Sequence, residues 1–130
     1  MDYRTFAVIV SMTLPVLAKA NPIQDGYRAA AKQENPAFAD FSAARGEAFY
    51  KAKTADVSCA SCHGDSPKAH GKHASTGKDI LPMAAVANAD RFTDAAKVEK
   101  WFKRNCSDVL KRACTAGEKG DFIAYLLSVK

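Results

Sequence analysis

Residues 59–63 read C-x-x-C-H, and this spacing constrains the fold more than any other feature of the chain. Two thiols separated by two residues on a helical turn can form thioethers with the two vinyl groups of one porphyrin. The adjacent imidazole is then held as an axial ligand of the iron. The motif therefore predicts one covalently bound haem c, attached through Cys59 and Cys62, with His63 as the proximal iron ligand.

The first twenty residues are predicted to be a signal peptide. Residues 6–18 are almost wholly apolar but include Pro15, and this run is shorter than the roughly 20 residues that a membrane span needs. Ala18-Lys19-Ala20 has the A-x-A form of a cleavage site; cleavage directly after Ala18 and a buried N-terminal helix are the alternatives. We expect an exported bacterial protein in the periplasm, with no stable membrane insertion after cleavage.

Composition sets the size and class of what remains. The chain has 130 residues, of which 48% are hydrophobic and 25% charged, with 19 Lys and Arg against 14 Asp and Glu. These values fit one globular domain and exclude a multidomain enzyme, a collagen-like repeat and a low-complexity linker. Residues 21–130 are therefore predicted to form a single monohaem cytochrome c domain.

Two other interpretations of the cysteine pair compete with haem attachment. A thioredoxin-type redox pair requires a βαβ context, whereas the segments around this motif have helical patterns. A zinc site requires two further ligands, for which His70 and His73 are candidates. The zinc interpretation leaves the export signal and the apolar helices unexplained.

The pattern of the chain is helical, with no convincing strand alternation and no internal repeat. Asn21-Pro22 predicts the start of a helix that stops at Asn35-Pro36. A second helix is predicted over about residues 40–53, and a third helix, capped by Thr93 or Asp90, reaches about Asn105. Residues 64–78 are polar and rich in Gly, Lys and Ser, which predicts a loop.

A last helix is predicted after residues 115–118, which have the T-x-x-E form of a capping box. Its apolar residues follow at i, i+3, i+4 and i+7: Phe122, Tyr125, Leu126 and Val129. Gly46, Phe49 and Tyr50 precede the haem motif, and this plan resembles the class I cytochromes c, in which the terminal helices cross at glycine and aromatic positions. The resemblance implies an all-α, class I cytochrome c-like fold around one covalently bound haem.

The ligand on the other side of the iron decides the function. A strong sixth ligand gives an electron carrier, whereas a weak one lets small molecules bind. Met83 follows His63 by 20 residues, a short connection for crossing to the opposite haem face, although Leu81-Pro82-Met83 resembles a ligand loop. His70 and His73 lie in a lysine-containing loop, where we expect solvated side chains.

Asn105 is a further candidate for the distal position. Val98, Trp101 and Phe102 form an apolar stripe at i, i+3 and i+4, and Asn105 follows at i+7. An amide on a buried stripe needs a partner, because leaving it unsatisfied costs about 1–3 kcal/mol. Asparagine is also a common helix C-cap. Periodicity alone does not decide whether Asn105 is an iron ligand or a helix C-cap.

Cys106 and Cys114 enclose a short segment directly after Asn105. Export favours a disulfide between them, and a free thiol pair is the alternative. A bridge that closes a loop of this size contributes roughly 2–3 kcal/mol. It would also fix the backbone beside Asn105.

Residues 45–127 resemble the SHP-type high-spin monohaem cytochromes c. The most specific matches are Asp90–Asp94, Val98–Trp101, Arg104–Cys106, Cys114 and Gly117–Lys119. In that family the asparagine before the disulfide cysteine is the sixth iron ligand of the oxidised protein, and it leaves on reduction or when a small ligand binds. A related cytochrome has a histidine there, which detaches on reduction. The resemblance implies that Asn105 is the displaceable distal ligand and that Cys106 and Cys114 form the disulfide.

The same resemblance implies a function. We expect an exported high-spin cytochrome that accepts electrons from a diheme or membrane cytochrome and reversibly binds oxygen, nitric oxide or carbon monoxide. Redox activity on oxygen or nitric oxide is compatible with the sequence, which does not decide whether turnover occurs. A plain electron carrier with a permanent Met83 or histidine ligand is the alternative. Exposed lysines could steer an acidic redox partner, and nucleic-acid binding is not expected, because basic and aromatic residues do not interleave.

Overall fold

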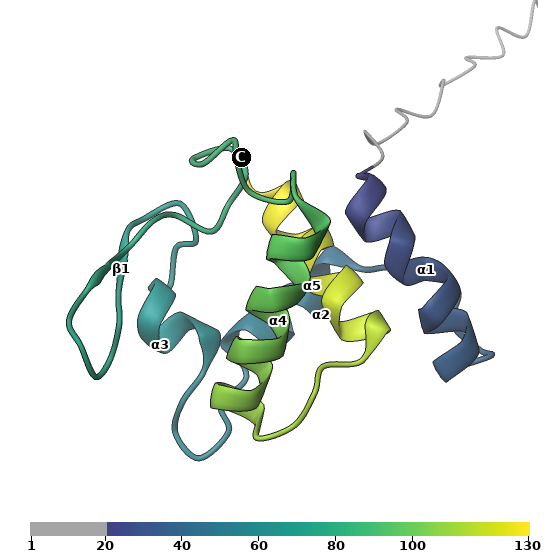
Figure 1. Ribbon diagram of the computed structural model, residues 1–130, viewed down its shortest axis with the longest axis horizontal. Coiled ribbons are helices and arrows are strands. Elements are labelled where there is room, and N and C mark those ends of the chain that lie inside the picture. Colours follow the sequence, from purple (N-terminus) through teal and green to yellow (C-terminus); the bar gives the residue numbers. More distant parts are fainter. Residues whose placement is uncertain (1–20) are drawn as a thin grey trace, which may run out of the picture.

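The computed structural model describes residues 21–130, so the predicted signal peptide at residues 1–20 lies outside the described residues. Five helices account for most of this part of the chain: α1 (Pro22–Glu34), α2 (Ala43–Lys51), α3 (Cys59–His63), α4 (Ala95–Leu110) and α5 (Ala116–Ser128). Two strands of two residues, β1 (Gly71–Lys72) and β2 (Asp79–Ile80), pair antiparallel; β1 lies in the segment predicted to be a loop, and β2 follows directly after that segment. The prediction of an all-α fold is confirmed (Figure 1).

Local capping explains where the outer helices begin. The Asn21 side chain accepts from the backbone N–H groups of Ile23 and Gln24 at the start of α1, and the chain leaves the helix at Asn35 as expected. At α5 the Thr115 side chain accepts from Glu118 N while Glu118 reaches back to Thr115 N. The predicted capping box is therefore confirmed.

The prediction for α4 was wrong at both ends. The helix begins at Ala95 with Asp94 as its N-cap, because Phe92 takes a left-handed conformation (φ 59°) and the Thr93 hydroxyl donates to the Asp90 carbonyl. It continues to Leu110, well beyond Asn105. The C-cap interpretation of Asn105 is therefore wrong.

Helix α2 is also shorter than the predicted 40–53. It begins at Ala43 because the Ser42 hydroxyl accepts from Arg45 N, and the buried Asp121 carboxylate of α5 accepts from Ser42 N at 2.7 Å. The Asp121 carboxylate also binds the Arg45 guanidinium at 2.7 and 2.9 Å. The start of α2 is thus set by the local Ser42 cap together with a tertiary contact to Asp121, and only the tertiary contact lies outside any local pattern.

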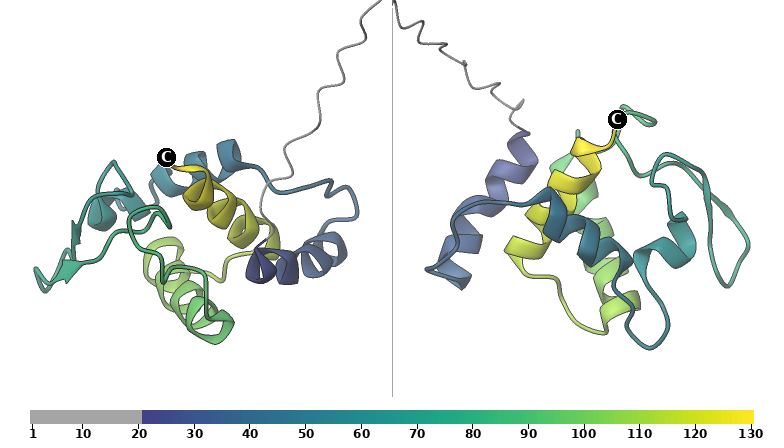
Figure 2. Two further views of the ribbon diagram at one scale, coloured as in Figure 1. Left: turned by 90° about the horizontal axis from the view of Figure 1, so that it is seen from above. Right: turned by 180° about the vertical axis from the view of Figure 1, so that it is seen from behind.

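The helices α2 and α5 cross in close contact, and α1 packs on α5 as well (Figures 1 and 2). At the crossing, a Cβ on Gly46 would overlap the backbone carbonyl of Asp121, so only glycine allows this approach. One turn after Gly46 in α2, the Tyr50 ring packs on Phe122 and Tyr125 with centroid separations of 6.2 and 5.6 Å. The predicted helix-crossing residues therefore do meet.

The three largest fully buried side chains are Tyr50 of α2 and Ile123 and Leu126 of α5. The view from above and the view from behind both place α1 and the β1–β2 segment at opposite ends of the molecule (Figure 2). Helices α3 and α4 lie between those ends. Within residues 21–130, no helix is long and apolar enough to cross a membrane.

Candidate haem site

Helix α3 presents the C-x-x-C-H motif as one capped turn. The Ser58 hydroxyl accepts from Ser61 N, and the Ser61 hydroxyl accepts from Ser58 N. At the other end Gly64 leaves the helix with φ 80°, and its carbonyl accepts from the Tyr50 hydroxyl at 2.7 Å. Because Tyr50 belongs to the core, this bond fixes the turn that carries His63 against helix α2.

A cavity of about 480 Å³ lies beside α3, within the size range of small-molecule and cofactor sites. Cys59, Cys62 and His63 line it from α3, and Asn105 lines it from α4. Most of the remaining wall is apolar, with side chains from α2, α4, α5 and the loops: Phe49, Val57, Ile80, Leu81, Trp101, Phe102, Val109, Leu110 and Phe122.

The chemistry of the motif residues fits covalent haem. Cys59 and Cys62 stand outside the Cys106–Cys114 disulfide, which leaves both sulfurs available for haem attachment, and both residues line one cavity. Burial raises the pKa of the Cys59 thiol to about 11, and burial together with the charge of Arg91 lowers the pKa of His63 to about 4. His63 is therefore a neutral imidazole, the form that binds metals. Its buried Nδ1 has no hydrogen-bond partner among residues 21–130.

Helix α4 turns a different face to the core than the predicted stripe. Val98, Phe102 and Cys106 are its buried residues, at i, i+4 and i+8. Trp101, predicted to be buried, is 37% exposed and lines the cavity together with Asn105. Asn105 is also exposed, and it stands on the cavity wall in the continuous part of the helix.

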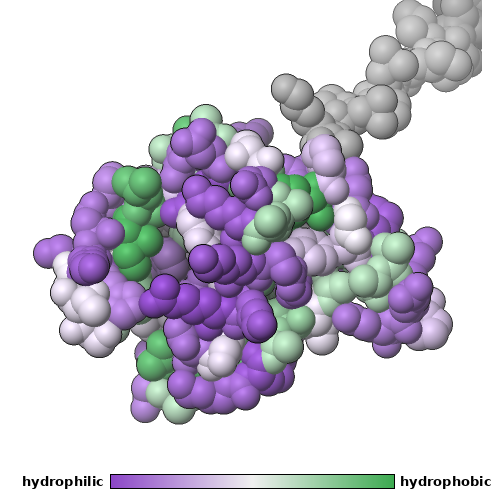
Figure 3. All heavy atoms as spheres, viewed as in Figure 1, coloured by the Kyte–Doolittle hydropathy of each residue, from purple (hydrophilic) through white to green (hydrophobic). Residues whose placement is uncertain are grey.

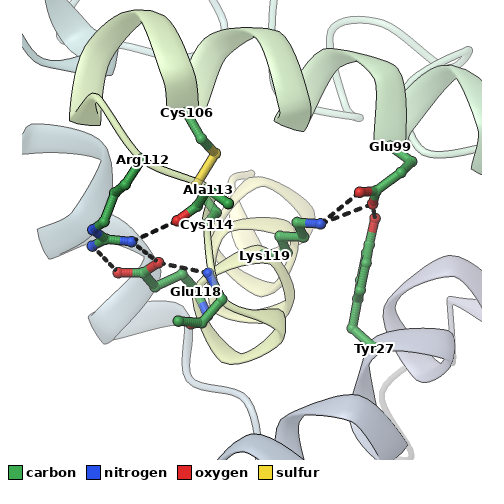
Figure 4. Close-up of a disulfide and its surroundings, with 9 residues drawn as sticks. Tyr27, Glu99, Cys106, Arg112, Ala113, Cys114, Glu118 and Lys119 are labelled. Atoms are coloured by element: carbon green, nitrogen blue, oxygen red, sulfur yellow. Dashed lines mark hydrogen bonds and ion pairs between the residues drawn. A yellow bond between two sulfur atoms is a disulfide. The ribbon is translucent and has the colours of Figure 1, made fainter.

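The structure joins Cys106 to Cys114, so the residue after Asn105 is covalently tied to the segment that enters α5 (Figure 4). Arg112 in the enclosed loop donates to both Glu118 carboxylate oxygens at 2.7 and 2.8 Å. This guanidinium is the main reason why the pKa of Glu118 lies below its ordinary value. On the other side of α5, Lys119 and Tyr27 both donate to Glu99 of α4. These bonds fix α4 relative to α5 and α1.

The rival ligands occupy different positions. Met83 is buried on the cavity wall, and its backbone N–H donates to the Pro67 carbonyl at 2.9 Å. This bond ties it to the segment that follows His63 directly. His70 is exposed and pairs with Asp79 at 2.7 Å, while His73 lies on the wall with its Nδ1 accepting from Thr76 N. In the described part of the chain, no group of three or more His, Cys, Asp and Glu residues could hold a metal ion.

Sequence reasoning missed the part that Arg91 has in the site. Arg91 is buried on the cavity wall and stacks on Trp101, with its guanidinium carbon 4.4 Å from the ring centroid. It lies in a loop between the hairpin and α4, where neither periodicity nor a motif marks a buried side chain. The one signal in the sequence was that Arg91 lies in the segment 90–94, which resembles the SHP-type proteins; that resemblance gave it no role.

Residues 36–126 match the family described as "Domain of unknown function (DUF1924)". The chain is 44% identical over 106 residues to the cytochrome c-type protein SHP of Cereibacter sphaeroides, covering 78% of this chain and 77% of that protein. The chain belongs to the SHP-type family of cytochromes c. Like its relatives, this cytochrome carries covalent haem c.

Further similarities agree with this assignment. The cytochrome is 39% identical over 129 residues to cytochrome c'' of Methylophilus methylotrophus, covering 95% of this chain and 90% of that protein. The crystal structure of oxidised cytochrome c'' superposes with a TM-score of 0.75 at 40% identity, over 83% of this chain and 92% of that chain. The structure of oxidised SHP gives 0.70 at 43% identity, over 80% and 91%. The class I cytochrome c-like fold is thereby confirmed.

Proposed function

We propose that this protein is an exported high-spin cytochrome that accepts electrons and reversibly binds oxygen, nitric oxide or carbon monoxide when Asn105 leaves the iron. Cys59 and Cys62 hold the haem c, His63 is the proximal ligand and Asn105 is the displaceable distal ligand. The observation that carries the proposal is the place of Asn105 within α4, on the wall of the cavity into which the α3 motif faces.

The relatives support this function. One solved structure is that of SHP described as an oxygen-binding cytochrome c, and one of cytochrome c'' is described as giving insights into haem-ligand detachment. The solution structure of cytochrome c'' superposes with a TM-score of 0.71 at 40% identity. Oxygen binding and ligand detachment are the two properties that we propose here.

When bound, haem c would supply a redox-active iron that can take a diatomic ligand. The Asn105 amide oxygen is a hard donor, which suits ferric iron better than the softer ferrous iron. The disulfide at Cys106 and the remaining turns of α4 restrain the backbone on both sides of Asn105. A side-chain rotation is therefore the expected movement, and we expect the amide to hydrogen-bond the bound diatomic after it.

An electron-donor cytochrome, diheme or membrane-bound, is the proposed redox partner. Lys97, Lys100 and Arg104 are exposed on α4, and Arg104 also lines the cavity. The face of the molecule over α4 is largely hydrophilic (Figure 3). A second cationic group, Lys68, Lys72 and Lys78, lies in the segment around the hairpin. Such charges would speed encounter with an acidic partner, so the rate of reduction by the donor should fall as ionic strength rises.

The proposal also includes where the protein acts. We place residues 21–130, as one monohaem domain, in the bacterial periplasm after removal of the signal peptide. Oxygen or nitric oxide bound at this site could be reduced there with electrons from the donor.

A plain electron carrier with Met83 as a permanent ligand is the second candidate, because Met83 is buried on the cavity wall. Two matched variants separate the candidates by the visible spectrum of the ferric protein. If Asn105 binds the iron, Asn105→Val changes the spectrum and Met83→Leu does not. The reverse result would establish the electron carrier.

A further inference from the structure

Arg91 is a buried cation that has no carboxylate partner among residues 21–130. Arg91 is 8% exposed. Its guanidinium donates to two neutral carbonyls, from Nε to Pro82 O and from Nη2 to Leu81 O, both at 2.8 Å. Burial lowers the pKa of Arg91 below its ordinary value. Burying a charge without an opposite charge is costly, so an unpaired guanidinium here requires a reason.

The aromatic neighbour of Arg91 offsets only part of this cost. The guanidinium lies 4.4 Å from the Trp101 ring centroid, and the Lys97 ammonium lies 5.3 Å from the same centroid. Cation–π contacts of this kind contribute favourably but leave the charge in place. Two cations on one indole ring also add positive potential, which favours an anion at this part of the wall.

The third guanidinium nitrogen, Nη1, is the group that remains for such an anion. Nη1 has no hydrogen-bond acceptor among the described residues. It is not among their fully buried polar atoms that lack a partner, so it is still accessible to a ligand, and Arg91 itself lines the cavity. The two carboxylates on the wall have other partners: Asp79 pairs with His70 and Asp108 with Arg104. Of the other titratable groups there, His63, His73 and Arg104 bring no negative charge, and Cys59 and Cys62 would be thioethers of the haem.

We propose that Arg91 pairs through Nη1 with one carboxylate of the bound haem c and thereby positions the haem in the cavity. Haem c has two such carboxylates, so the group proposed for this cavity carries the required anion. The inference rests on the proposed attachment of haem in this cavity, but it does not depend on Asn105 being an iron ligand.

The other contacts of Arg91 show what this pairing would align. Through the carbonyls of Leu81 and Pro82 it holds the segment that carries Met83, and through Trp101 it contacts α4 one turn before Asn105. The haem carboxylate would thus be fixed relative to the segment that carries Met83 and to helix α4, which carries Asn105. Arg91 acts in this account as a positioning residue.

The test reads the carboxylates directly, in holocytochrome whose haem carboxylates are labelled with ¹³C. An opposite charge in contact lowers the pKa of a carboxyl by one unit or more. In Arg91→Met we expect one of the two ¹³C resonances to titrate at a pH higher by roughly one unit or more than in the wild type, with the other unchanged. Arg91→Lys keeps the charge, so in this variant the same carboxylate should titrate at nearly the same pH as in the wild type.

Arg104→Met is the matched control, because it removes the same charge from an exposed arginine on the same cavity wall. Both resonances should titrate there as in the wild type. If both also titrate as in the wild type in Arg91→Met, the pairing is wrong. Should Arg91→Met fail to accumulate with haem, the wild type decides: one of its two ¹³C resonances should titrate at a clearly lower pH than the other, and two resonances that titrate together at the ordinary carboxyl pKa would overturn the pairing.

Discussion

Asn105 on α4 and His63 on α3 lie on the wall of one cavity, although they are 42 positions apart in the sequence. The amide stands within a helix that continues to Leu110, and the next residue is bound to Cys114. The backbone that carries the proposed distal ligand is therefore held on both sides. Exchange at this position should involve the Asn105 side chain and not a movement of the helix.

The α2–α5 crossing should fail when Gly46 gains a side chain. A Cβ there overlaps the Asp121 carbonyl, so Gly46→Ala must separate the helices or distort α5. We expect a loss of about 1–3 kcal/mol in the free energy of unfolding, measured by urea denaturation. Gly26→Ala is the control, because a Cβ at that position in α1 meets nothing within 4 Å, and it should stabilise by about 0.5–1 kcal/mol. Equal effects at the two positions would show that the crossing does not require glycine.

The Cys106–Cys114 disulfide should contribute roughly 2–3 kcal/mol to the free energy of unfolding, because it closes a short loop in the unfolded chain. The double variant Cys106→Ala/Cys114→Ala removes it, and urea denaturation of both proteins measures the loss. Reduction of the wild type without substitution should give a similar loss. An unchanged midpoint in both experiments would mean that the bridge stabilises nothing.

Glu118 should make stability depend on pH. Its pKa lies below the ordinary 4.5, first because of its bonds to Arg112, so its stabilising contribution is complete above about pH 4.5 and disappears as the pH falls through the lower folded value. We expect Glu118→Gln to cost about 1–2 kcal/mol at pH 7 and much less near pH 3, measured by urea denaturation across this range. A cost that stays constant down to pH 3 would assign the effect to shape and not to charge.

The sequence predicted best what depends on neighbouring residues. The caps at Asn21 and Thr115 and the C-x-x-C-H turn are local, and the structure has helices at all three positions. The extent of α4 was not predictable in the same way, since it depends on the left-handed turn at Phe92. The burial of Arg91 was not predictable either, because its partners are carbonyls nine and ten residues earlier and a tryptophan ten residues later.

The most direct test of the proposed function is the addition of carbon monoxide to the ferrous protein, followed by visible absorption. Asn105 should leave ferrous iron readily, so we predict a high-spin ferrous spectrum that changes rapidly when carbon monoxide is added. A low-spin ferrous spectrum that carbon monoxide leaves unchanged would contradict a displaceable Asn105 and establish a permanent sixth ligand.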